Sequence, residues 1–286
     1  MSCKYVLAFV VIAALSFPAA AFGEQVGYLS PQCPRTPEGM EYFARGADFD
    51  FGRNGVVSSN SRAEMYYEKA LRLGDSAAAM NLGALYQSMG LNKYDELYRH
   101  SLAVRFFEQA TAMGCPDGYL ALADAYSLIF SPLYDEKKSL EYLILAVEQG
   151  SITAKGIYGK RLCDEAGKDK DAAKRERGIA LMEESLKDGN GHVAPDLASA
   201  YRIAGRAEDM VEALRQGCRL GSKKSLFSAH YLYSDDWFFK QPKDEKHMRL
   251  ILDLYDSISD YDPIKPIPDF DKLVPPRPVV SVKKWW

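Results

Sequence analysis

The stretch YYEKALRLGDSAAAMNLGALY, residues 66–86, decides the fold of this chain. Small residues alternate in it with tyrosine and leucine, and Gly74 divides it in the middle. The same arrangement recurs around further glycines that follow an apolar helical pattern: Gly114, Gly150, Gly189 and Gly221. The intervals between these glycines are 40, 36, 39 and 32 residues. A repeat of this length predicts helical units that stack on their neighbours.

The copies agree column by column when they are aligned on these glycines. Four residues before each glycine stands a small residue: Ala70, Ala110, Ala146, Ser185 and Gly217. Twelve residues after it stands a bulky one: Tyr86, Tyr126, Leu162, Tyr201 and Tyr233. Small residues let two helix axes approach, and rings at a fixed spacing fill the adjoining core. We expect core packing for the tyrosines, and a left-handed helix end at each central glycine.

The stretch 66–86 therefore holds the second helix of one unit, a turn, and the first helix of the next. The sequence predicts an all-α, right-handed solenoid of about six helix pairs over residues 38–258, after an extended segment at 24–37. Thr36 and Pro37 suit the entry of the first helix. Ser61 and Glu64 fit a capping box at the next one. We expect residues 164–177 to form a solvated loop that runs into a helix, and residues 235–244 a longer aromatic loop.

The first 23 residues carry the pattern of a signal peptide. Lys4 precedes an apolar run from Tyr5 to Phe17, and Pro18 and three alanines follow it. The run is shorter than the roughly 20 residues that span a bilayer, so a cleaved signal is favoured over an anchor. We therefore predict export to the periplasm, with cleavage after Ala21 or Gly23.

Export changes the interpretation of the cysteines, because disulfides persist in oxidising compartments. Cleavage would leave four cysteines, which allow three pairings: Cys33, Cys115, Cys163 and Cys218. The last three stand within or beside helical patterns, where a buried free thiol is common. The sequence leaves the pairing open, and the absence of a CxxC motif argues against a redox or zinc site.

The columns resemble Sel1-like repeats, a family of TPR-like helix pairs. The clearest match joins residues 79–86 (AMNLGALY) to residues 106–114 (FFEQATAMG). At the repeat position of Gly83, later copies have Ala198 and then His230, so the pattern weakens toward the C-terminus. The resemblance implies an α-solenoid that binds other proteins.

Residues 259–286 depart from the repeat. Six of the chain's 14 prolines lie there, which excludes a continuing helix and predicts an extended tail. The tail resembles the C-terminal segment of a group of exported Sel1-type proteins, on the residues Ile267, Pro268, Asp269, Asp271, Lys272, Leu273, Val274, Pro275 and Pro276. Some members of that group are immunity proteins for phospholipase effectors of type VI secretion. The ending Trp285–Trp286 departs from the commoner single tryptophan.

No motif for catalysis, metal binding or a cofactor stands out. His100, His192, His230 and His247 are far apart, and there is neither a GxSxG elbow nor a P-loop. Nine residues after its central glycine, His230 stands where the earlier copies have small residues (Gly83, Ala123, Gly159 and Ala198), so we expect a packed histidine there. The net charge of -3 and the pI near 5.9 argue against nucleic-acid binding. We predict that the chain is not an enzyme and takes no cofactor or metal.

Two groups of aromatic residues are candidates for partner binding. Trp237, Phe238 and Phe239 are consecutive, so they cannot all face one helix core. They either plug the last repeats or form a binding patch. Trp285 and Trp286 pose the same choice, because tryptophan is enriched in binding hot spots. We expect the prolines of the tail to fold back on the solenoid and the tryptophans to bind a partner.

The sequence thus predicts a periplasmic solenoid with a protein partner. The resemblance implies an immunity protein that occludes the active site of a secreted phospholipase. The alternative is a general cell-envelope scaffold or adaptor without an inhibitory role. The oligomeric state is left open.

Overall fold

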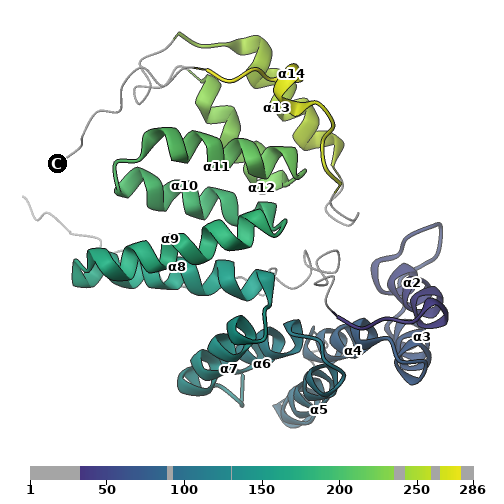
Figure 1. Cartoon of the computed structure of the whole chain (residues 1–286). Helices are drawn as coiled ribbons and strands as arrows, with labels where there is room; N and C mark the ends of the chain where they lie inside the picture. The colour runs from purple at the N-terminus through teal and green to yellow at the C-terminus, as the bar shows by residue number, and fades with distance from the viewer. Residues whose placement is uncertain (1–32, 89–92, 130, 235–241, 259–264, 278–286) are drawn as a thin grey trace, which may run out of the picture.

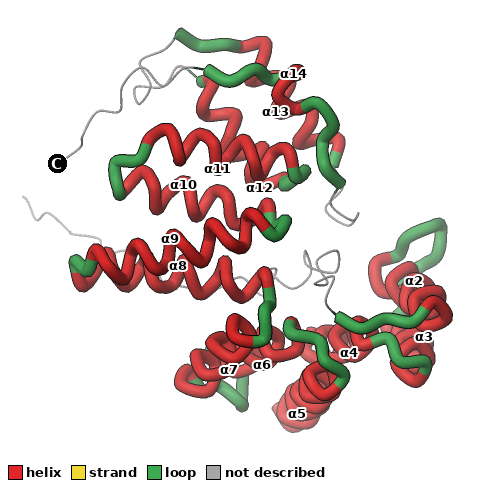
Figure 2. Tube along the Cα trace, viewed as in Figure 1, coloured by secondary structure: helices red, strands yellow, loops and turns green. Residues whose placement is uncertain are grey.

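A computed structural model of the chain describes residues 33–88, 93–129, 131–234, 242–258 and 265–277. These residues contain helices and no strand (Figure 2). The α-helices are α2 (Pro37–Phe51), α3 (Asn60–Arg72), α4 (Ser76–Ser88), α5 (Lys93–Ala112), α6 (Asp117–Ser127), α7 (Glu136–Glu148), α8 (Ile152–Asp169), α9 (Ala172–Lys187), α10 (Ala194–Ile203), α11 (Ala207–Arg219), α12 (Lys223–Ala229), α13 (Glu245–Ser257) and α14 (Phe270–Leu273). Two 3₁₀ helices, η2 (Gly191–Val193) and η3 (His230–Tyr233), precede α10 and follow α12.

Among the described residues the helices pack as six consecutive pairs. These are α2 with α3, α4 with α5, α6 with α7, α8 with α9, α10 with α11, and α12 and η3 with α13. Figure 1 shows α2–α7 along the lower part of the stack and α8–α13 rising above them, with the bend between α7 and α8. The prediction of an all-α solenoid is therefore confirmed.

Each central glycine adopts a positive φ at the end of the second helix of a pair. The φ angles of Gly74, Gly114, Gly150, Gly189 and Gly221 are 89°, 83°, 89°, 105° and 78°. The next residue then turns its amide back onto the helix, as Asp75 N–H does to the carbonyl of Ala70 at 3.1 Å. Because side chains strain this backbone region, glycine recurs at every turn.

The residue after the glycine forms a column that the sequence analysis missed. Asp75, Ser151, Asn190 and Ser222 are buried, and each side chain accepts a hydrogen bond from an amide in the first turn of the following helix. These are side chains that commonly cap helix N-termini. Several members of the column also bond to a neighbouring pair or turn, as Ser151 Oγ does to Asp117 at 2.5 Å. The column thus starts one pair and fixes it to the one before.

The small residues allow helices to touch at their backbones. Ala70, Ala110, Ala146 and Ser185 are fully buried. In the fourth pair, Gly159 of α8 and Gly178 of α9 face each other. A Cβ atom added to Gly159 would lie 2.6 Å from the carbonyl oxygen of Gly178. The two helix axes can lie this close only because neither residue carries a side chain.

The aromatic columns take two environments. Tyr201 and Tyr233 lie in the core. Tyr86 and Tyr126 are half-buried and stack on the next helix, with ring centroids 5.6 Å from Phe106 and 5.7 Å from Tyr142. Two further rings, Tyr67 of α3 and Phe107 of α5, are fully buried on the second helices of their pairs.

Helix starts agree with the sequence in one place and differ in another. Thr36 accepts a hydrogen bond from Gly39 N–H at 3.1 Å and Pro37 opens α2, as predicted. The capping box at Ser61 and Glu64 is wrong. The helix begins two residues earlier, after Ser59, whose amide bonds to the carbonyl of Phe49. Glu64 instead accepts a hydrogen bond from the hydroxyl of Tyr86 in the next pair.

The predicted loop at residues 164–177 is also wrong, because most of it is helical. The helix α8 continues to Asp169, and α9 begins at Ala172 with Asp171 as its cap. Lys170, at φ 55°, and Asp171 separate the two helices. The charged side chains fit a helix surface because they form ion pairs along it, such as Arg161–Glu165.

The tail folds back on the last repeats and includes one helical turn, α14, where an extended chain was expected. Phe270 and Val274 are buried in the core cluster of the last pairs. Buried Arg215 of α11 donates hydrogen bonds to the carbonyl of Val274 at 2.8 Å, to the hydroxyl of Tyr233 at 3.1 Å and to Asp271. The tail residues that resemble other proteins therefore hold the tail in place.

Candidate protein-binding site

The described residues hold one arrangement that resembles a hydrolytic triad. His100 lies with Nδ1 3.4 Å from Ser131 Oγ and Nε2 3.9 Å from Glu96. Both distances are long for a proton relay. Ser131 is buried, and its hydroxyl oxygen already accepts a hydrogen bond from Leu133 N–H. This arrangement holds the loop before α7 against α5.

The other reactive groups in the described part of the chain are not arranged for chemistry. Burial raises the pKa of the Cys163 thiol to about 11 and that of Cys218 to about 12, so both remain protonated. The described residues contain no cluster of three or more His, Cys, Asp or Glu side chains that could hold a metal ion. None of the helices in the same part of the chain is long and apolar enough to cross a membrane.

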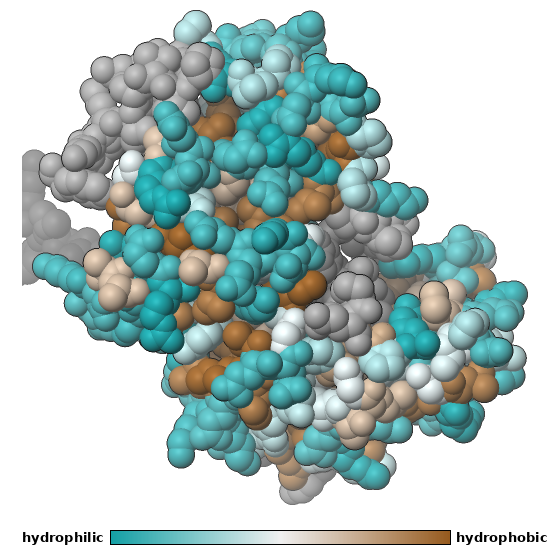
Figure 3. Space-filling view, viewed as in Figure 1, coloured by the Kyte–Doolittle hydropathy of each residue, from teal (hydrophilic) through white to brown (hydrophobic). Residues whose placement is uncertain are grey.

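Charged side chains gather on the first helices of the later pairs. The helices α8, α10 and α12 contact one another in order along the stack. Lys160 and Asp164 of α8 form an ion pair at 2.5 Å. Burial raises the pKa of Asp196 of α10. The charges of Lys160 and of Lys224 of α12 oppose this rise, and the charge of Asp164 adds to it. Figure 3 shows hydrophilic residues over much of this upper part of the molecule.

His192 lies in η2, directly before α10, with Nδ1 3.4 Å from Ser222 Oγ. Burial, followed by the charge of Lys224, lowers its pKa to about 4. The unfolded chain takes up a proton near pH 6.5 and the folded chain only near pH 4. His192 therefore does not lower the free energy of unfolding above pH 6.5, and lowers it progressively as the pH falls from 6.5 to 4.

A His192→Gln variant should lack this part of the acid sensitivity. We expect wild type to lose about 1–2 kcal/mol more stability than the variant between pH 7 and 4.5, measured by urea unfolding. Asp244 pairs with His247 at 2.7 Å on the same part of the molecule, so His247→Gln serves as the matched control. Equal losses in wild type and the His192 variant would contradict the assignment.

An aromatic patch lies at the last helix pair. We define the end patch as Phe227, His230, Tyr231 and Tyr255. Phe227 is 48% exposed and Tyr231 is 51% exposed, although both rings are large. The Phe227 ring lies 5.3 to 6.0 Å from the other three. His230 packs on Tyr231 at the surface rather than in the core, because the helix narrows to η3 at this residue.

Among the described residues no further helix pair covers the end patch. Phe227 stands six residues after its central glycine, where Leu120 stands in the third pair. Leu120 is buried in a cluster with Ala146 of α7 and with Ala154 of α8, the first helix of the next pair. The same position in the last described pair keeps an exposed ring, a feature typical of an interaction surface.

The residues predicted from sequence to bind a partner, Trp237, Phe238, Phe239, Trp285 and Trp286, lie outside the described residues. Their described neighbours are brought together. Asp244 N–H bonds to the carbonyl of Tyr233 at 2.9 Å. Arg277 donates to the carbonyls of Leu232 and Pro242, at 3.3 and 2.7 Å. The described residues that flank the two aromatic segments, Ser234, Pro242 and Arg277, therefore lie close to η3.

Comparison with known proteins gives structural neighbours only. No model of a known protein family matches the sequence, and a search of curated proteins finds no relative. The Pseudomonas aeruginosa protein PA5086 is similar in structure, with a TM-score of 0.67 and 18% identity. The P. aeruginosa immunity protein Pa5087 has a TM-score of 0.65 and 19% identity. Each comparison covers 86% of this chain and 91% of the other.

A Sel1 repeat protein from Oxalobacter formigenes is similar over 77% of this chain and 87% of its own, with a TM-score of 0.53 and 18% identity. At such identities the likeness shows the fold. The expected resemblance to Sel1 repeat proteins and to immunity proteins is found in the structures. This chain has the fold of the Sel1-type α-solenoids.

Proposed function

We propose that this chain is an immunity protein that works in the periplasm by binding a type VI secreted phospholipase and covering its active site. The observation that carries the proposal is the structural similarity to a P. aeruginosa immunity protein over 86% of this chain. The tail motif that folds onto Arg215 supports it, because the same motif carries the sequence resemblance to exported proteins of this kind.

The binding site includes Trp237, Phe238, Phe239, Trp285 and Trp286 together with the end patch. The Arg277 contacts support this location, because they hold the described residues that flank the two aromatic segments beside η3. Exposed aromatic side chains bury large areas at a low entropic cost and so contribute most to binding energy. The charged surface of α8, α10 and α12 lies beside the end patch and would set the orientation of the partner.

Inhibition requires an interface that dissociates slowly. An area of about 1,600 Å² or more is typical of complexes that mask an enzyme. Related complexes differ in affinity mainly through their dissociation rates. Protection of a cell would therefore depend on well-packed residues at the centre of the interface, which slow dissociation. A solenoid supplies such an area without a conformational change, since its helix pairs already form a continuous surface.

The test is a titration of the chain into a lipid-hydrolysis assay of the phospholipase encoded nearest to its gene. We expect activity to fall to the background at one molar equivalent. A Phe227→Ser/Tyr231→Ser double variant should weaken inhibition about 1,000-fold, since each hot-spot side chain contributes about 2 kcal/mol. Tyr98→Ser is the control, because Tyr98 is 66% exposed on α5, far along the chain from the end patch.

At micromolar protein concentrations, a roughly tenfold molar excess of the chain would reveal even a micromolar binder. Full phospholipase activity under these conditions would contradict the immunity role for that pair. The scaffold function would then be favoured, and the similarity to the O. formigenes Sel1 repeat protein is the observation on its side. Inhibition that the end-patch variant retains in full would keep the function and move the binding site elsewhere on the solenoid.

A further inference from the structure

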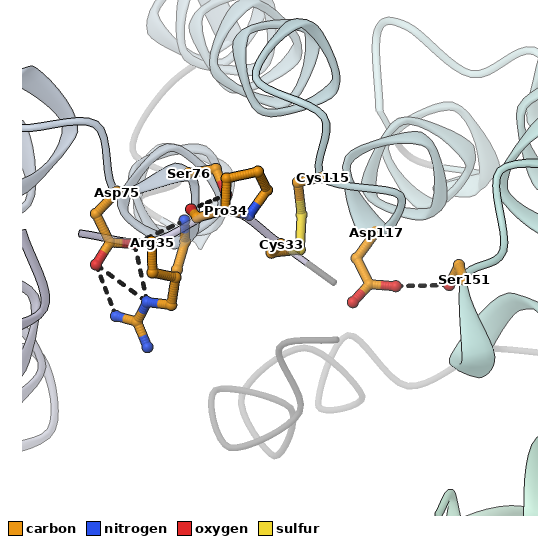
Figure 4. Close-up of a disulfide and its surroundings, with 9 residues drawn as sticks. Cys33, Pro34, Arg35, Asp75, Ser76, Cys115, Asp117 and Ser151 are labelled. Carbon is orange, nitrogen blue, oxygen red and sulfur yellow. Dashed lines mark hydrogen bonds and ion pairs between the residues drawn. A yellow bond between two sulfur atoms is a disulfide. The ribbon is translucent and has the colours of Figure 1, made fainter. Parts of the chain in front are cut away.

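The residues before the first helix cross the turns between the first three helix pairs. We call residues 33–36 the N-terminal arm (Figure 4). Pro34 accepts hydrogen bonds from the amide and the hydroxyl of Ser76, at 3.0 and 2.8 Å. The hydroxyl of Thr36 donates to the carbonyl of Leu73 at 2.8 Å. The arm therefore contacts the turn at Gly74 before it enters α2.

A disulfide fixes the other end of the arm to the next turn. Cys33 bonds to Cys115, which follows Gly114 and lies 82 residues further along the chain. The arm thus joins two successive inter-pair turns, both on the side of the stack where α4 and α6 begin. A covalent link across this distance removes conformational freedom from the unfolded chain.

Cys115 occupies the column whose other members cap helices. Asp75, Ser151, Asn190 and Ser222 all give a side-chain acceptor to the helix that follows. At Cys115 the α6 helix has no side-chain cap. The chain therefore lacks a stabilising cap at this one turn and has a cross-link to the arm in its place.

Both cysteines are buried when the arm is closed, within the core cluster of the second and third pairs. Cys33 is 5% exposed and Cys115 is 1% exposed. Beside them, Arg35 reaches Asp75 with Nη2 2.8 Å from Oδ2, and the Asp75 side chain is fully buried. Thiol–disulfide exchange requires in-line access to a sulfur atom, so neither formation nor reduction of this bond can proceed while the arm is closed.

We propose that the Cys33–Cys115 bond is a maturation lock that fixes the first helix pair onto the solenoid after the chain has met an oxidant. In the open form, one thiolate attacks the disulfide of a protein thiol oxidant and forms a mixed disulfide. The second cysteine, as its thiolate, displaces the oxidant, which leaves as a dithiol. The two cysteines lose two protons and two electrons, and the oxidant gains them. Arm closure then buries the new bond.

The lock determines in which compartment the fold of the chain is completed. In a reducing compartment the arm keeps its hydrogen bonds, the Arg35–Asp75 ion pair and the contact of Arg35 with the Phe43 ring but loses the covalent link, so α2 and α3 open more often. After export, oxidation holds them in place and burial protects the bond from reduction. This inference does not depend on the identity of the partner.

Two neighbouring amides report the state of the arm in hydrogen exchange of the full chain. Ser76 N–H donates to Pro34, so its protection depends on the arm. Asp75 N–H donates to Ala70 within the turn, so it serves as the internal control. In denaturant-reduced, refolded protein we expect Ser76 to exchange about tenfold faster than in the oxidised protein, with a smaller change at Asp75.

Variants separate the cross-link from the fold of the turn. Cys115→Ser places at this turn the residue that caps helices at Ser151 and Ser222, so it removes the bond without removing a cap. It should show the same exchange at Ser76 as the reduced protein. Cys163→Ser removes a free cysteine of α8 and should leave Ser76 protection unchanged.

The shielding of the bond is tested by reduction of the native protein with dithiothreitol. We expect a slow rate that no longer rises at high reagent concentration, because arm opening limits it. Arg35→Gln should raise this rate about tenfold by weakening the closed arm. Arg72→Gln, in the exposed pair with Glu68, is the matched control. Equal Ser76 protection in oxidised, reduced and Cys115→Ser protein, or immediate reduction of the native bond, would overturn the lock.

Discussion

A Gly159→Val variant should lose about 3 kcal/mol of stability, because the new side chain would occupy space already filled by the backbone of α9. A Cβ atom at this position meets the carbonyl oxygen of Gly178 at 2.6 Å and Met182 Cγ at 2.8 Å. The carbonyl oxygen cannot change rotamer, so α8 and α9 would have to move apart. Relief at one crossing would then disturb the stacking of both neighbouring pairs.

Gly167→Val is the matched control, since it introduces the same side chain in the same helix. A Cβ atom at Gly167 has nothing within 4 Å, and valine has a slightly better helix propensity than glycine. We expect a change of at most about 0.5 kcal/mol there. Thermal and urea unfolding of the two variants provide the comparison. Similar stabilities would show that the α8–α9 crossing is not as close as described.

An Arg215→Met variant should release the C-terminal tail and cost about 3 kcal/mol. The guanidinium group is 3% exposed and makes three contacts that methionine cannot replace, with Tyr233, Asp271 and Val274. Its removal leaves the carbonyl of Val274 buried without that donor, and an unsatisfied buried group is costly. Phe270 and Val274 then lose the partner that holds them in the core.

Limited proteolysis measures this release directly. Trypsin should cut the Arg215→Met variant after Lys272 at least roughly tenfold faster than wild type, because cleavage requires the tail to open. Arg202→Met, an exposed arginine on α10, should leave the cleavage rate unchanged. A tail that stays resistant in the Arg215 variant would mean that the buried apolar side chains hold it without the arginine.

Local signals explain why the repeats can be predicted. The helix pairs are each made by residues fewer than about 40 positions apart, and every copy repeats the same requirement for a glycine turn and a small residue. The errors at Ser61 and at residues 164–177 have a different origin. Both concern polar residues, whose side chains serve equally in caps, in ion pairs on helix surfaces and in contacts with another pair. Glu64 illustrates this, since its partner Tyr86 lies in the next pair.

The proposed binding site is harder to predict because it depends on contacts between distant residues. Nothing local to Phe227 distinguishes it from Leu120; the difference is that a further pair covers Leu120, whereas none covers Phe227 among the described residues. The aromatic segments could be named from the sequence. The described residues that flank them are held beside η3 by Arg277, whose two acceptors lie 45 and 35 residues earlier in the chain.

The sequence by itself determined the helical repeat, its period and the glycine at each turn, because these depend on backbone conformation and on neighbours along the chain. Only the tertiary structure decided which cysteines pair, which arginine holds the tail and which aromatic residues stay exposed. Cys33 and Cys115 are 82 residues apart, and Arg215 and Asp271 are 56 apart. Contacts over such separations form only when the stack brings the segments together, so no short pattern of residues encodes them.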